Sequence, residues 1–277
     1  AANIESARYA VERRLGSGAM GTVFLAHDRA LNRKVAIKRV KGVATAERRE
    51  RLRAEAQTMA QLSHPNVASV FDVGEDEQGL FVAMQWVDGG TARDWLSQTP
   101  RSWREIVKMF IEAGNGLAAA HAANIVHRDF KPSNVLVASN GEVRVTDFGL
   151  ASFSLSPSVT PALVEPLNAY GTWLTQSGAL IGTPAYMAPE QHRGEAASVQ
   201  SDQFSFCVAL TEALTGQRPF SGQTLKALRE SIDSGPRFAG AFSKLPSPLQ
   251  RALRRGMAAD PLQRFESMSE LVQTLRQ

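Results

Sequence analysis

Four polar side chains that could act together on one ligand flank a short predicted hairpin: Asp129, Lys131, Asn134 and Asp147. Between the last two, the sequence has an apolar run at 135–137, an Asn-Gly turn at 140–141 and an alternating segment at 142–146. An Asn-Gly pair between apolar segments predicts a β-hairpin, whose ends lie together, so we expect the four side chains to meet. Two carboxylates, an amide and an ammonium group suit a metal-bound polyphosphate. His-Arg-Asp at 127–129 alone would equally fit a solvated turn, and its spacing from Asp-Phe-Gly at 147–149 favours the polyphosphate site.

A glycine-rich turn near the N-terminus offers a second feature that suits phosphate. Gly16, Gly18 and Gly21 are followed by the β-branched, apolar segment 22–26. Dinucleotide-binding folds share this glycine spacing, but there the glycines open a helix, whereas segment 22–26 predicts a strand. The glycines are therefore expected to cap a hairpin, where the lack of Cβ atoms lets backbone N–H groups approach phosphate oxygens.

Lys38 lies within the apolar segment 34–40, which predicts a strand. A buried lysine is costly unless its ammonium group meets an anion. The helix predicted over 46–62 carries Glu55 on the same stripe as its apolar residues, which makes this carboxylate the unusual member of that stripe. We expect Lys38 and Glu55 to form an ion pair, and two separately solvated side chains are the alternative.

The remaining pattern separates strands from helices. Segments 67–73 and 80–84 are predicted strands, and Gly89-Gly90 marks a change of direction that we interpret as a hinge. From 103 onward the pattern is mostly helical, and Ser201-Asp202 is expected to cap a buried apolar helix. The prediction is an α+β fold of two lobes, a small antiparallel β-sheet lobe with one main helix and a larger, mostly α-helical lobe. A flat slot for adenine is expected from five apolar side chains: Leu15, Val23, Ala36, Met84 and Leu136.

Composition narrows the class of protein. With 277 residues, 43% hydrophobic and 21% charged, the chain can bury one large core or two lobes. The net charge of +4 is mild, and the basic residues at 48–53 are interleaved with acids at helical spacing, so no nucleic-acid partner is expected. The single cysteine, Cys207, excludes an intrachain disulfide and fits a reducing, cytoplasmic compartment. The sequence has neither a bilayer-spanning apolar run nor a signal-peptide pattern, so no membrane segment is expected within it, although regions outside it could provide a tether.

The motifs occur in the order found in the eukaryotic-like, or Hanks-type, protein kinases, and the chain resembles that family over nearly its whole length. The resemblance is carried by the glycine turn, Lys38, Glu55, His127-Arg128-Asp129, Asn134, Asp147, Ala188-Pro189-Glu190, Asp202 and Arg264. Lys131 and the Gly182-Thr183-Pro184 turn are similar to serine/threonine kinases, and segments 182–191 and 201–220 look like bacterial members. The resemblance implies the catalytic domain of a bacterial serine/threonine protein kinase.

This resemblance also implies the extent of each part. The whole chain, 1–277, would form the kinase domain, with an N-lobe at about 1–84, a hinge at about 85–90 and a C-lobe at about 91–277. An activation segment would span 147–190. Glu190 and Arg264 resemble the family's buried ion pair, which joins the end of the activation segment to a late helix.

For the nucleotide, the resemblance implies that the three glycines cover the phosphates and that Lys38, held by Glu55, contacts the α- and β-phosphates. Thr91 stands where many relatives offer an acid to the ribose, so modest nucleotide affinity is expected. The residues expected to bind ATP are Leu15, Gly16, Ser17, Gly18, Gly21, Val23, Ala36, Lys38, Met84, Gln85, Val87, Thr91, Asn134, Leu136 and Asp147.

For the chemistry, the resemblance implies that Asp129 accepts the proton of the substrate hydroxyl and that Lys131 neutralises the γ-phosphoryl group. Asn134 and Asp147 would hold Mg²⁺, with Mn²⁺ as an alternative metal. The expected activity is transfer of the γ-phosphoryl group of ATP to Ser and Thr hydroxyls of proteins, including the chain's own activation loop. The catalytic residues implied are Asp129, Lys131, Lys38, Glu55 and Thr183.

Regulation is expected through Arg128, which directly precedes Asp129 and would lack an ion-pair partner unless an anion joins it. A phosphate on the hydroxyl-rich segment 152–180 would pair with this cation. Thr175 and Ser177 precede Gly182 at a spacing that resembles the phosphorylated pair of bacterial kinases, so autophosphorylation there is expected, with a dimer of the chain as the route. The alternative is a loop whose hydroxyls only keep it soluble, and Ser152, at a position where a basic partner for the phosphate is common, favours that alternative.

Two other functions compete with the kinase. A pseudokinase would keep the fold as a scaffold without transfer, but such proteins normally lack the lysine, aspartate or asparagine that are present here. A small-molecule phosphotransferase of related fold would lack segment 183–190, which in protein kinases supports a polypeptide substrate.

Overall fold

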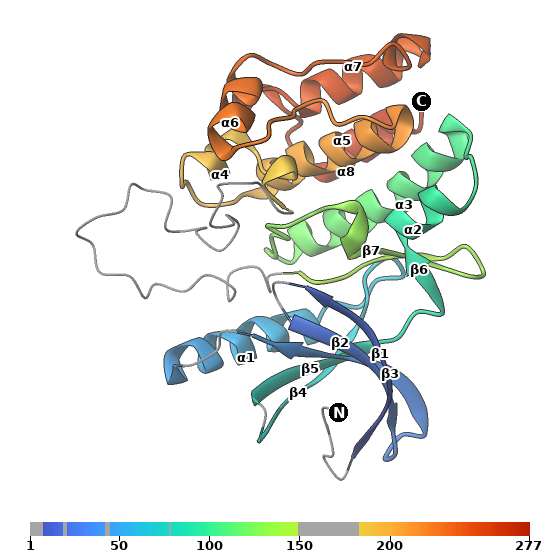
Figure 1. Ribbon diagram of the computed structural model, residues 1–277, viewed down its shortest axis with the longest axis vertical. Helices are drawn as coiled ribbons and strands as arrows, with labels where there is room; N and C mark the ends of the chain where they lie inside the picture. Colours follow the sequence, from blue (N-terminus) through green and yellow to red (C-terminus); the bar gives the residue numbers. More distant parts are fainter. Residues whose placement is uncertain (1–7, 19–20, 42–44, 78, 149–182) are drawn as a thin grey trace.

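The chain was analysed as a computed structural model that describes residues 8–18, 21–41, 45–77, 79–148 and 183–277. Its N-terminal part is an antiparallel sheet of five strands in the order β1-β2-β3-β5-β4, with helix α1 beside it (Figure 1). The elements are β1 (Tyr9–Gly18), β2 (Gly21–Asp28), β3 (Arg33–Val40), α1 (Ala46–Ala60), β4 (Val70–Asp76) and β5 (Gly79–Gln85).

Both faces of this sheet are apolar, which explains why β5 is a nearly continuous hydrophobic run. One face buries Phe24, Ile37 and Phe81 among its own side chains. The other face packs Ala36 and Met84 against α1, whose Leu52 is fully buried. Burial of apolar surface on both faces therefore fixes the strand register and holds α1 next to the sheet.

A second, smaller sheet joins the two parts of the chain. It consists of β6 (Gly89–Thr91), β7 (Val135–Ala138) and β8 (Val143–Val145), and β7 and β8 form the hairpin predicted around Asn140-Gly141. Gly89, which we interpreted as a hinge residue, lies in β6 instead. A Cβ atom there would stand 2.1 Å from the Val137 carbonyl oxygen, so a glycine is needed for β6 to pair with β7.

The C-terminal part is mostly helical and occupies the upper half of Figure 1. Helix α5 is at its centre, and every residue from Ser201 to Thr211 is buried. The expected cap at Ser201-Asp202 is wrong, because Ser198 caps α5 and Asp202 lies inside the first turn. The helices are α2 (Ala92–Gln98), α3 (Trp103–Ala122), α4 (Pro189–His192), α5 (Val199–Thr215), α6 (Leu225–Asp233), α7 (Ser247–Gly256) and α8 (Met268–Leu275).

The predicted α+β fold with a sheet lobe and a helical lobe is confirmed. β5 ends at Gln85 and β6 begins at Gly89, whereas the hinge at about 85–90 and the bounds of the lobes stay predictions. Within the described ranges, the structure contains no helix with both the length and the apolar character needed to cross a bilayer.

Candidate active site

The loop before β7 brings three of the predicted polar side chains together. The Lys131 Nζ lies 2.6 Å from the Asp129 Oδ2, and the Asn134 Nδ2 donates to the Asp129 backbone oxygen at 2.9 Å. The loop closes in a 3₁₀ turn over Pro132–Asn134, and the Thr146 N–H donates to the Asn134 oxygen at 2.9 Å, which places Asp147 beside the loop. The convergence expected from the hairpin is therefore present.

The carboxylate of Asp129 is only half satisfied. Its residue is 4% exposed and its Oδ2 is bound to Lys131, whereas its Oδ1 is buried and has no hydrogen-bond partner in the described structure. A buried acceptor without a donor is costly, and such atoms in native proteins call for an explanation. A substrate hydroxyl donating to this oxygen would satisfy it, which fits the role of a base that accepts the hydroxyl proton.

The loop around Asp129 contains a strained backbone that contacts with helix α5 hold in place. Arg128 and Asp147 have φ values of 71° and 66°, in the left-handed region that non-glycine residues rarely adopt. The carboxylate of Asp202 compensates by accepting the backbone N–H groups of His127 at 2.7 Å and of Arg128 at 2.9 Å. Helix α5, the buried centre of the lobe, therefore fixes the geometry of the residue before Asp129. Sequence reasoning missed this role of Asp202 because it assigned the residue to a helix cap.

His127 is a neutral packing residue within the site. It is fully buried, its Nε2 is 3.0 Å from the Thr146 backbone oxygen, and its ring lies 4.7 Å from that of Phe148. Burial lowers the pKa of His127, although the carboxylates of Asp202, Asp129 and Asp147 act in the opposite direction. The imidazole therefore positions Asp147-Phe148 and does not add a charge to the site.

The expected Lys38–Glu55 ion pair is replaced by two other pairs. The Lys38 Nζ lies 2.8 Å from the Asp147 Oδ2, and the Glu55 Oε1 lies 3.1 Å from the Arg128 NH1. Lys38 is buried, with 5% of its side chain exposed. It pairs with Asp147, so the prediction that it needs an anion is right and the predicted partner is wrong for this conformation.

The glycine turn divides into two kinds of glycine. A Cβ atom at Gly21 would stand 2.0 Å from the Arg39 carbonyl oxygen, so pairing of β2 with β3 requires this glycine. A Cβ atom at Gly16 or Gly18 would meet nothing within 4 Å. Packing therefore does not require those two glycines, whereas close approach of backbone N–H groups to an anion would. The open space at Gly16 and Gly18 therefore fits a turn that binds a polyphosphate.

The residues expected around adenine lie on adjacent strands. Ala36 of β3 faces Met84 of β5 in the strand register, and Val23 packs on the cluster that contains both. Leu136 stands opposite Thr91 in the second sheet, and Leu15 is 39% exposed on β1. The remaining nucleotide residues are Ser17 at the glycine turn, Gln85 at the end of β5 and Val87 between the two sheets.

Thr91, which stands where an acid was expected, is the N-cap of α2. Its Oγ1 donates to the Asp94 Oδ2 at 2.7 Å and accepts the Asp94 N–H at 3.2 Å. The hydroxyl is therefore already used in a capping box, which supports the expectation that Thr91 contributes little to a ribose.

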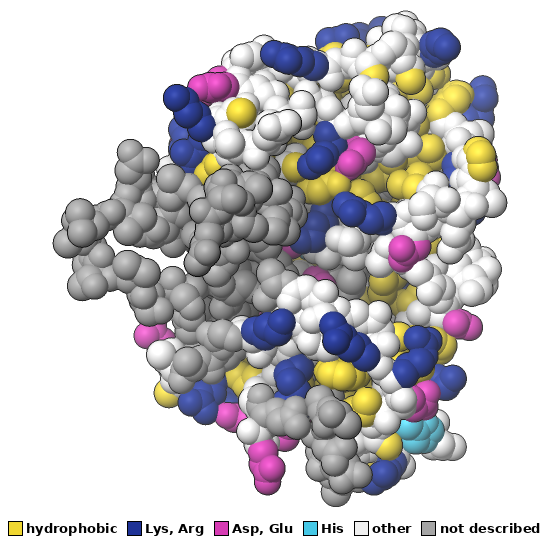
Figure 2. All heavy atoms as spheres, in the orientation of Figure 1, with side chains coloured by type: hydrophobic (Ala, Val, Ile, Leu, Met, Phe, Trp, Pro, Cys, Tyr) yellow, Lys and Arg dark blue, Asp and Glu magenta, His cyan; other side chains and the backbone are white. Residues whose placement is uncertain are grey.

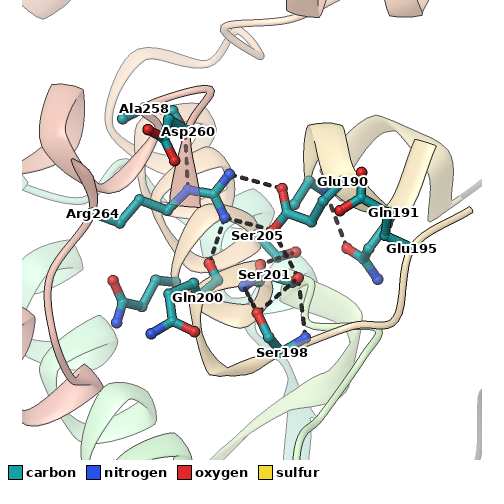
Figure 3. A network of polar contacts seen from close by, with 12 residues as sticks. Glu190, Gln191, Glu195, Ser198, Gln200, Ser201, Ser205, Ala258, Asp260 and Arg264 are labelled. Atoms are coloured by element: carbon teal, nitrogen blue, oxygen red, sulfur yellow. Dashed lines mark hydrogen bonds and ion pairs between the residues drawn. The ribbon is translucent and has the colours of Figure 1, made fainter. Parts of the chain in front are cut away.

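The predicted Glu190–Arg264 ion pair is confirmed and is bidentate (Figure 3). The two N–O distances are 2.7 Å and 2.9 Å, and both residues are buried. Glu190 also accepts the Ser201 hydroxyl at 2.8 Å, while the Arg264 guanidinium donates to the backbone oxygens of Gln200 and Ala258 at 2.9 Å each. The pair therefore ties α4 to the start of α5 and to the loop before α8.

Several predicted residues fall outside the described part of the chain. These are Thr175, Ser177 and Ser152, together with most of the activation segment. Thr183 begins the 3₁₀ turn Thr183–Tyr186, and its side chain is not among those described.

Comparison with known proteins gives the family. Residues 9–274 match the protein kinase domain, which is nearly the whole chain. The chain belongs to the protein kinase family. Its curated relatives include the probable serine/threonine-protein kinase PknB of Lactococcus lactis, 36% identical over 96% of this chain. They also include the serine/threonine-protein kinases PrkC of Bacillus subtilis, 32% identical over 96%, and PknA of Mycobacterium tuberculosis, 36% identical over 95%.

These relatives are longer proteins. The chain spans 41% of PknB, 40% of PrkC and 59% of PknA. The fold also matches the crystal structure of the Mycobacterium tuberculosis PknI kinase domain, with a TM-score of 0.71 and 24% identity, covering 100% of this chain and 98% of that one. Membership of the kinase family implies ATP, a divalent metal and protein substrates.

Proposed function

We propose that this chain is an ATP-dependent serine/threonine protein kinase that transfers the γ-phosphoryl group of Mg-ATP to Ser and Thr hydroxyls of proteins. The observation that carries the proposal is the buried, half-satisfied carboxylate of Asp129 beside Lys131. It offers an acceptor for a hydroxyl proton next to a cation for a phosphoryl oxygen. Proteins named serine/threonine-protein kinases share about a third of the sequence over almost all of this chain.

Each residue has one task in the proposed reaction. Asp129 orients the substrate hydroxyl and takes its proton as the hydroxyl oxygen bonds to the γ-phosphorus, while the bond to the β–γ bridging oxygen breaks and ADP leaves. Lys131 offsets charge on the γ-phosphoryl oxygens, and the glycine turn donates backbone N–H groups to the phosphates. Lys38 contacts the α- and β-phosphates once its ammonium group leaves Asp147.

A divalent ion would be held by Asn134 and Asp147, where it would supply positive charge to offset that of the phosphates. Two side chains suit Mg²⁺, which keeps several waters and phosphate oxygens as ligands and seldom uses a cage of protein groups alone. Among the described residues, no cluster of three or more His, Cys, Asp or Glu side chains could hold a metal by itself. The site therefore fits a metal that arrives with the nucleotide, with Mg²⁺ proposed first and Mn²⁺ as the alternative.

The two ion pairs at the site support a regulated enzyme. Lys38 is held by Asp147 and Glu55 by Arg128, so the Lys38–Glu55 contact of the expected active arrangement requires both pairs to exchange. Lys38 would have to leave the Asp147 carboxylate before that carboxylate could hold a metal. A phosphate on the activation segment would compete with Glu55 for Arg128, because it carries more charge and more acceptor oxygens than a carboxylate. We propose that autophosphorylation at Thr175, Ser177 or both, between two copies of the chain, supplies that phosphate.

The pseudokinase remains the second candidate, and the Lys38–Asp147 pair is the observation that favours it, since this pair occupies the lysine and the metal ligand together. Turnover separates the two functions. A scaffold would bind nucleotide without releasing ADP in step with substrate phosphorylation.

The proposed function is tested by incubating the purified chain with ATP, Mg²⁺ or Mn²⁺, and a general protein substrate. We expect metal-dependent phosphate on Ser and Thr residues, detected by mass spectrometry, with tyrosine unmodified. Phosphate on neither substrate nor chain, with nucleotide still bound, would support the pseudokinase. No nucleic-acid partner is proposed. The cytoplasm is proposed as the compartment because the site needs ATP and because the single cysteine is free and buried.

A further inference from the structure

A groove of about 1050 Å³ runs between the glycine turn, α2, the Asp129 loop and the end of α5. Its floor includes apolar side chains of α2, α3 and α5, namely Leu96, Ile106, Ala213 and Leu214. Ser17, Gly18 and Lys131 are among its lining residues, so the groove borders the residues proposed to contact the phosphates. The lining residue Lys131 lies 2.6 Å from the Asp129 Oδ2, so a segment in this groove would lie next to the proposed base.

The charged side chains that line the groove are strongly biased toward one sign. Four are cations: Arg93, Arg101, Lys131 and Arg218. Among the described lining residues, Glu212 is the one carboxylate. In Figure 2, Lys and Arg side chains lie around the middle of the visible face, between the sheet lobe below and the helices above.

The two oxygens of Glu212 already have partners within the groove. Its Oε2 accepts the Tyr186 hydroxyl at 2.5 Å, and its Oε1 lies 3.6 Å from the Arg218 Nε. Burial and the contact with Glu212 raise the pKa of Tyr186 to about 12, while Arg93 acts in the opposite direction, so Tyr186 stays a hydrogen-bond donor at neutral pH. The charge of Glu212 is therefore offset from within the groove.

The arginines that line the groove have contacts that hold their side chains, and they keep N–H groups that could bind a ligand. Arg101 stacks on the Trp95 ring at 4.2 Å, and its contact with Glu105 is long, at 4.0 Å. Arg218 meets Glu212 through Nε, and 42% of its side chain is exposed. Arg93 is exposed on α2 beside Tyr186. Lys131 is committed to Asp129 and belongs to the catalytic set.

We propose that this groove selects protein segments in which acidic residues flank the acceptor Ser or Thr, and that Arg93 and Arg218 are the positioning residues for those acids. The inference rests on the proposed kinase activity and deepens it by naming the substrate class. Guanidinium groups suit this role because they present several N–H donors in a plane that matches a carboxylate. Charge complementarity of this kind chiefly determines which partner binds and how fast it does so.

The test uses three peptide sets with one acceptor Ser or Thr, flanked on either side by Asp and Glu, by Asn and Gln, or by Lys and Arg. Each contact with an exposed cation contributes little, so we expect the acidic set to exceed the neutral set about fivefold in kcat/KM. The preference should shrink as salt rises, because the cations are exposed to solvent. Binding of matching peptides with Ala at the acceptor position, followed by fluorescence anisotropy, gives the same order without any turnover.

Variants assign the preference to the groove. The double variant Arg93→Glu, Arg218→Glu should lose the acidic preference or reverse it, whereas Arg251→Glu, on exposed α7, should keep it. Equal binding of all three sets, stronger binding of the basic set, or an acidic preference that survives in the double variant would overturn the inference. Absence of phosphate transfer to every peptide and protein would instead contradict the proposed function, and the anisotropy measurement would still decide the charge preference.

Discussion

The buried ion pair between Glu190 and Arg264 allows one stability effect to be worked out from the structure. The substitution Arg264→Met keeps most of the side-chain volume and removes the charge. It leaves the Glu190 carboxylate, whose residue is 3% exposed, with the Ser201 hydroxyl as its remaining side-chain donor. It also removes the donors to the Gln200 and Ala258 carbonyl oxygens.

Removing one partner of a buried pair costs about 3–5 kcal/mol, because the other charge stays buried without compensation. For a chain of this size, we therefore expect the melting temperature to fall by about 6–20 °C. Arg193→Met is the matched control, because Arg193 makes a 2.6 Å contact with Glu195 but both side chains are more than half exposed. Its effect should stay within about 1 kcal/mol.

The pH dependence of stability gives a second test of the Arg264→Met variant. In the wild type, burial raises and the Arg264 contacts lower the pKa of Glu190, with a net lowering. The stabilisation from this group is therefore present above the ordinary carboxyl pKa of about 4.3 and is lost as pH falls through the lower folded-state value. In the variant, the lowering by Arg264 is gone and burial, the largest influence, still raises the pKa of Glu190, so protonation of this carboxyl reduces the destabilisation as pH falls.

Thermal melts of wild type, Arg264→Met and Arg193→Met at several pH values measure both effects. The difference between wild type and Arg264→Met should be largest near pH 7 and should shrink toward about pH 4. The double variant Glu190→Leu, Arg264→Met should recover part of the loss, because no uncompensated charge remains. A melting curve for Arg264→Met that matches the Arg193→Met control would refute the reasoning.

Three further predictions concern the metal site, the control segment and the pH range of stability. Asp147→Asn should leave less than about a tenth of the wild-type phosphate transfer, because a lost metal ligand costs several kcal/mol in the transition state. The variant should also lose some stability, because the buried Lys38 loses its ion-pair partner. Higher turnover would exclude a metal role for this carboxylate. The double variant Thr175→Ala, Ser177→Ala should show lower activity and less phosphate by mass spectrometry. Full activity would contradict regulation by phosphorylation at these two residues and would not affect the catalytic proposal. Burial lowers the pKa of His192 to about 4, so between about pH 6.5 and 4 this residue binds a proton in the unfolded chain but not in the folded chain. The free energy of unfolding should therefore fall by up to about 3 kcal/mol as the pH is lowered from about 6.5 to 4. His192→Gln should flatten that part of the stability curve, and an unchanged slope would mean that His192 is not the group responsible.

The parts that sequence patterns predicted well are those determined by local chemistry. The Asn140-Gly141 turn defines the β7–β8 hairpin because few residue pairs tolerate its backbone angles, and Gly141 has a φ of 88°. The apolar run of β5 and the apolar residues of β3 likewise define the sheet, since both of its faces are buried. The Glu190–Arg264 pair followed from the family resemblance and is present.

The parts that could not be predicted depend on how distant segments approach one another. The need of Lys38 for an anion follows from burial, but the choice between Glu55 and Asp147 depends on where α1 lies relative to the loop. Gly89 carries a turn signal in the sequence, whereas close contact with the Val137 oxygen explains it in the structure. Asp202 follows a serine at a helix start, which fits a cap, but strained backbone N–H groups from a loop over seventy residues away take its carboxylate.

The most direct test of the central claim is the rate of phosphate transfer to a protein substrate by Asp129→Asn at saturating ATP and Mg²⁺. Asparagine keeps the size of the side chain but cannot take the hydroxyl proton, so the rate should fall by about a hundredfold or more while nucleotide affinity stays close to that of the wild type. Asp233→Asn, an exposed carboxylate at the end of α6, should transfer phosphate at the wild-type rate. An Asp129→Asn variant as fast as Asp233→Asn would contradict the account.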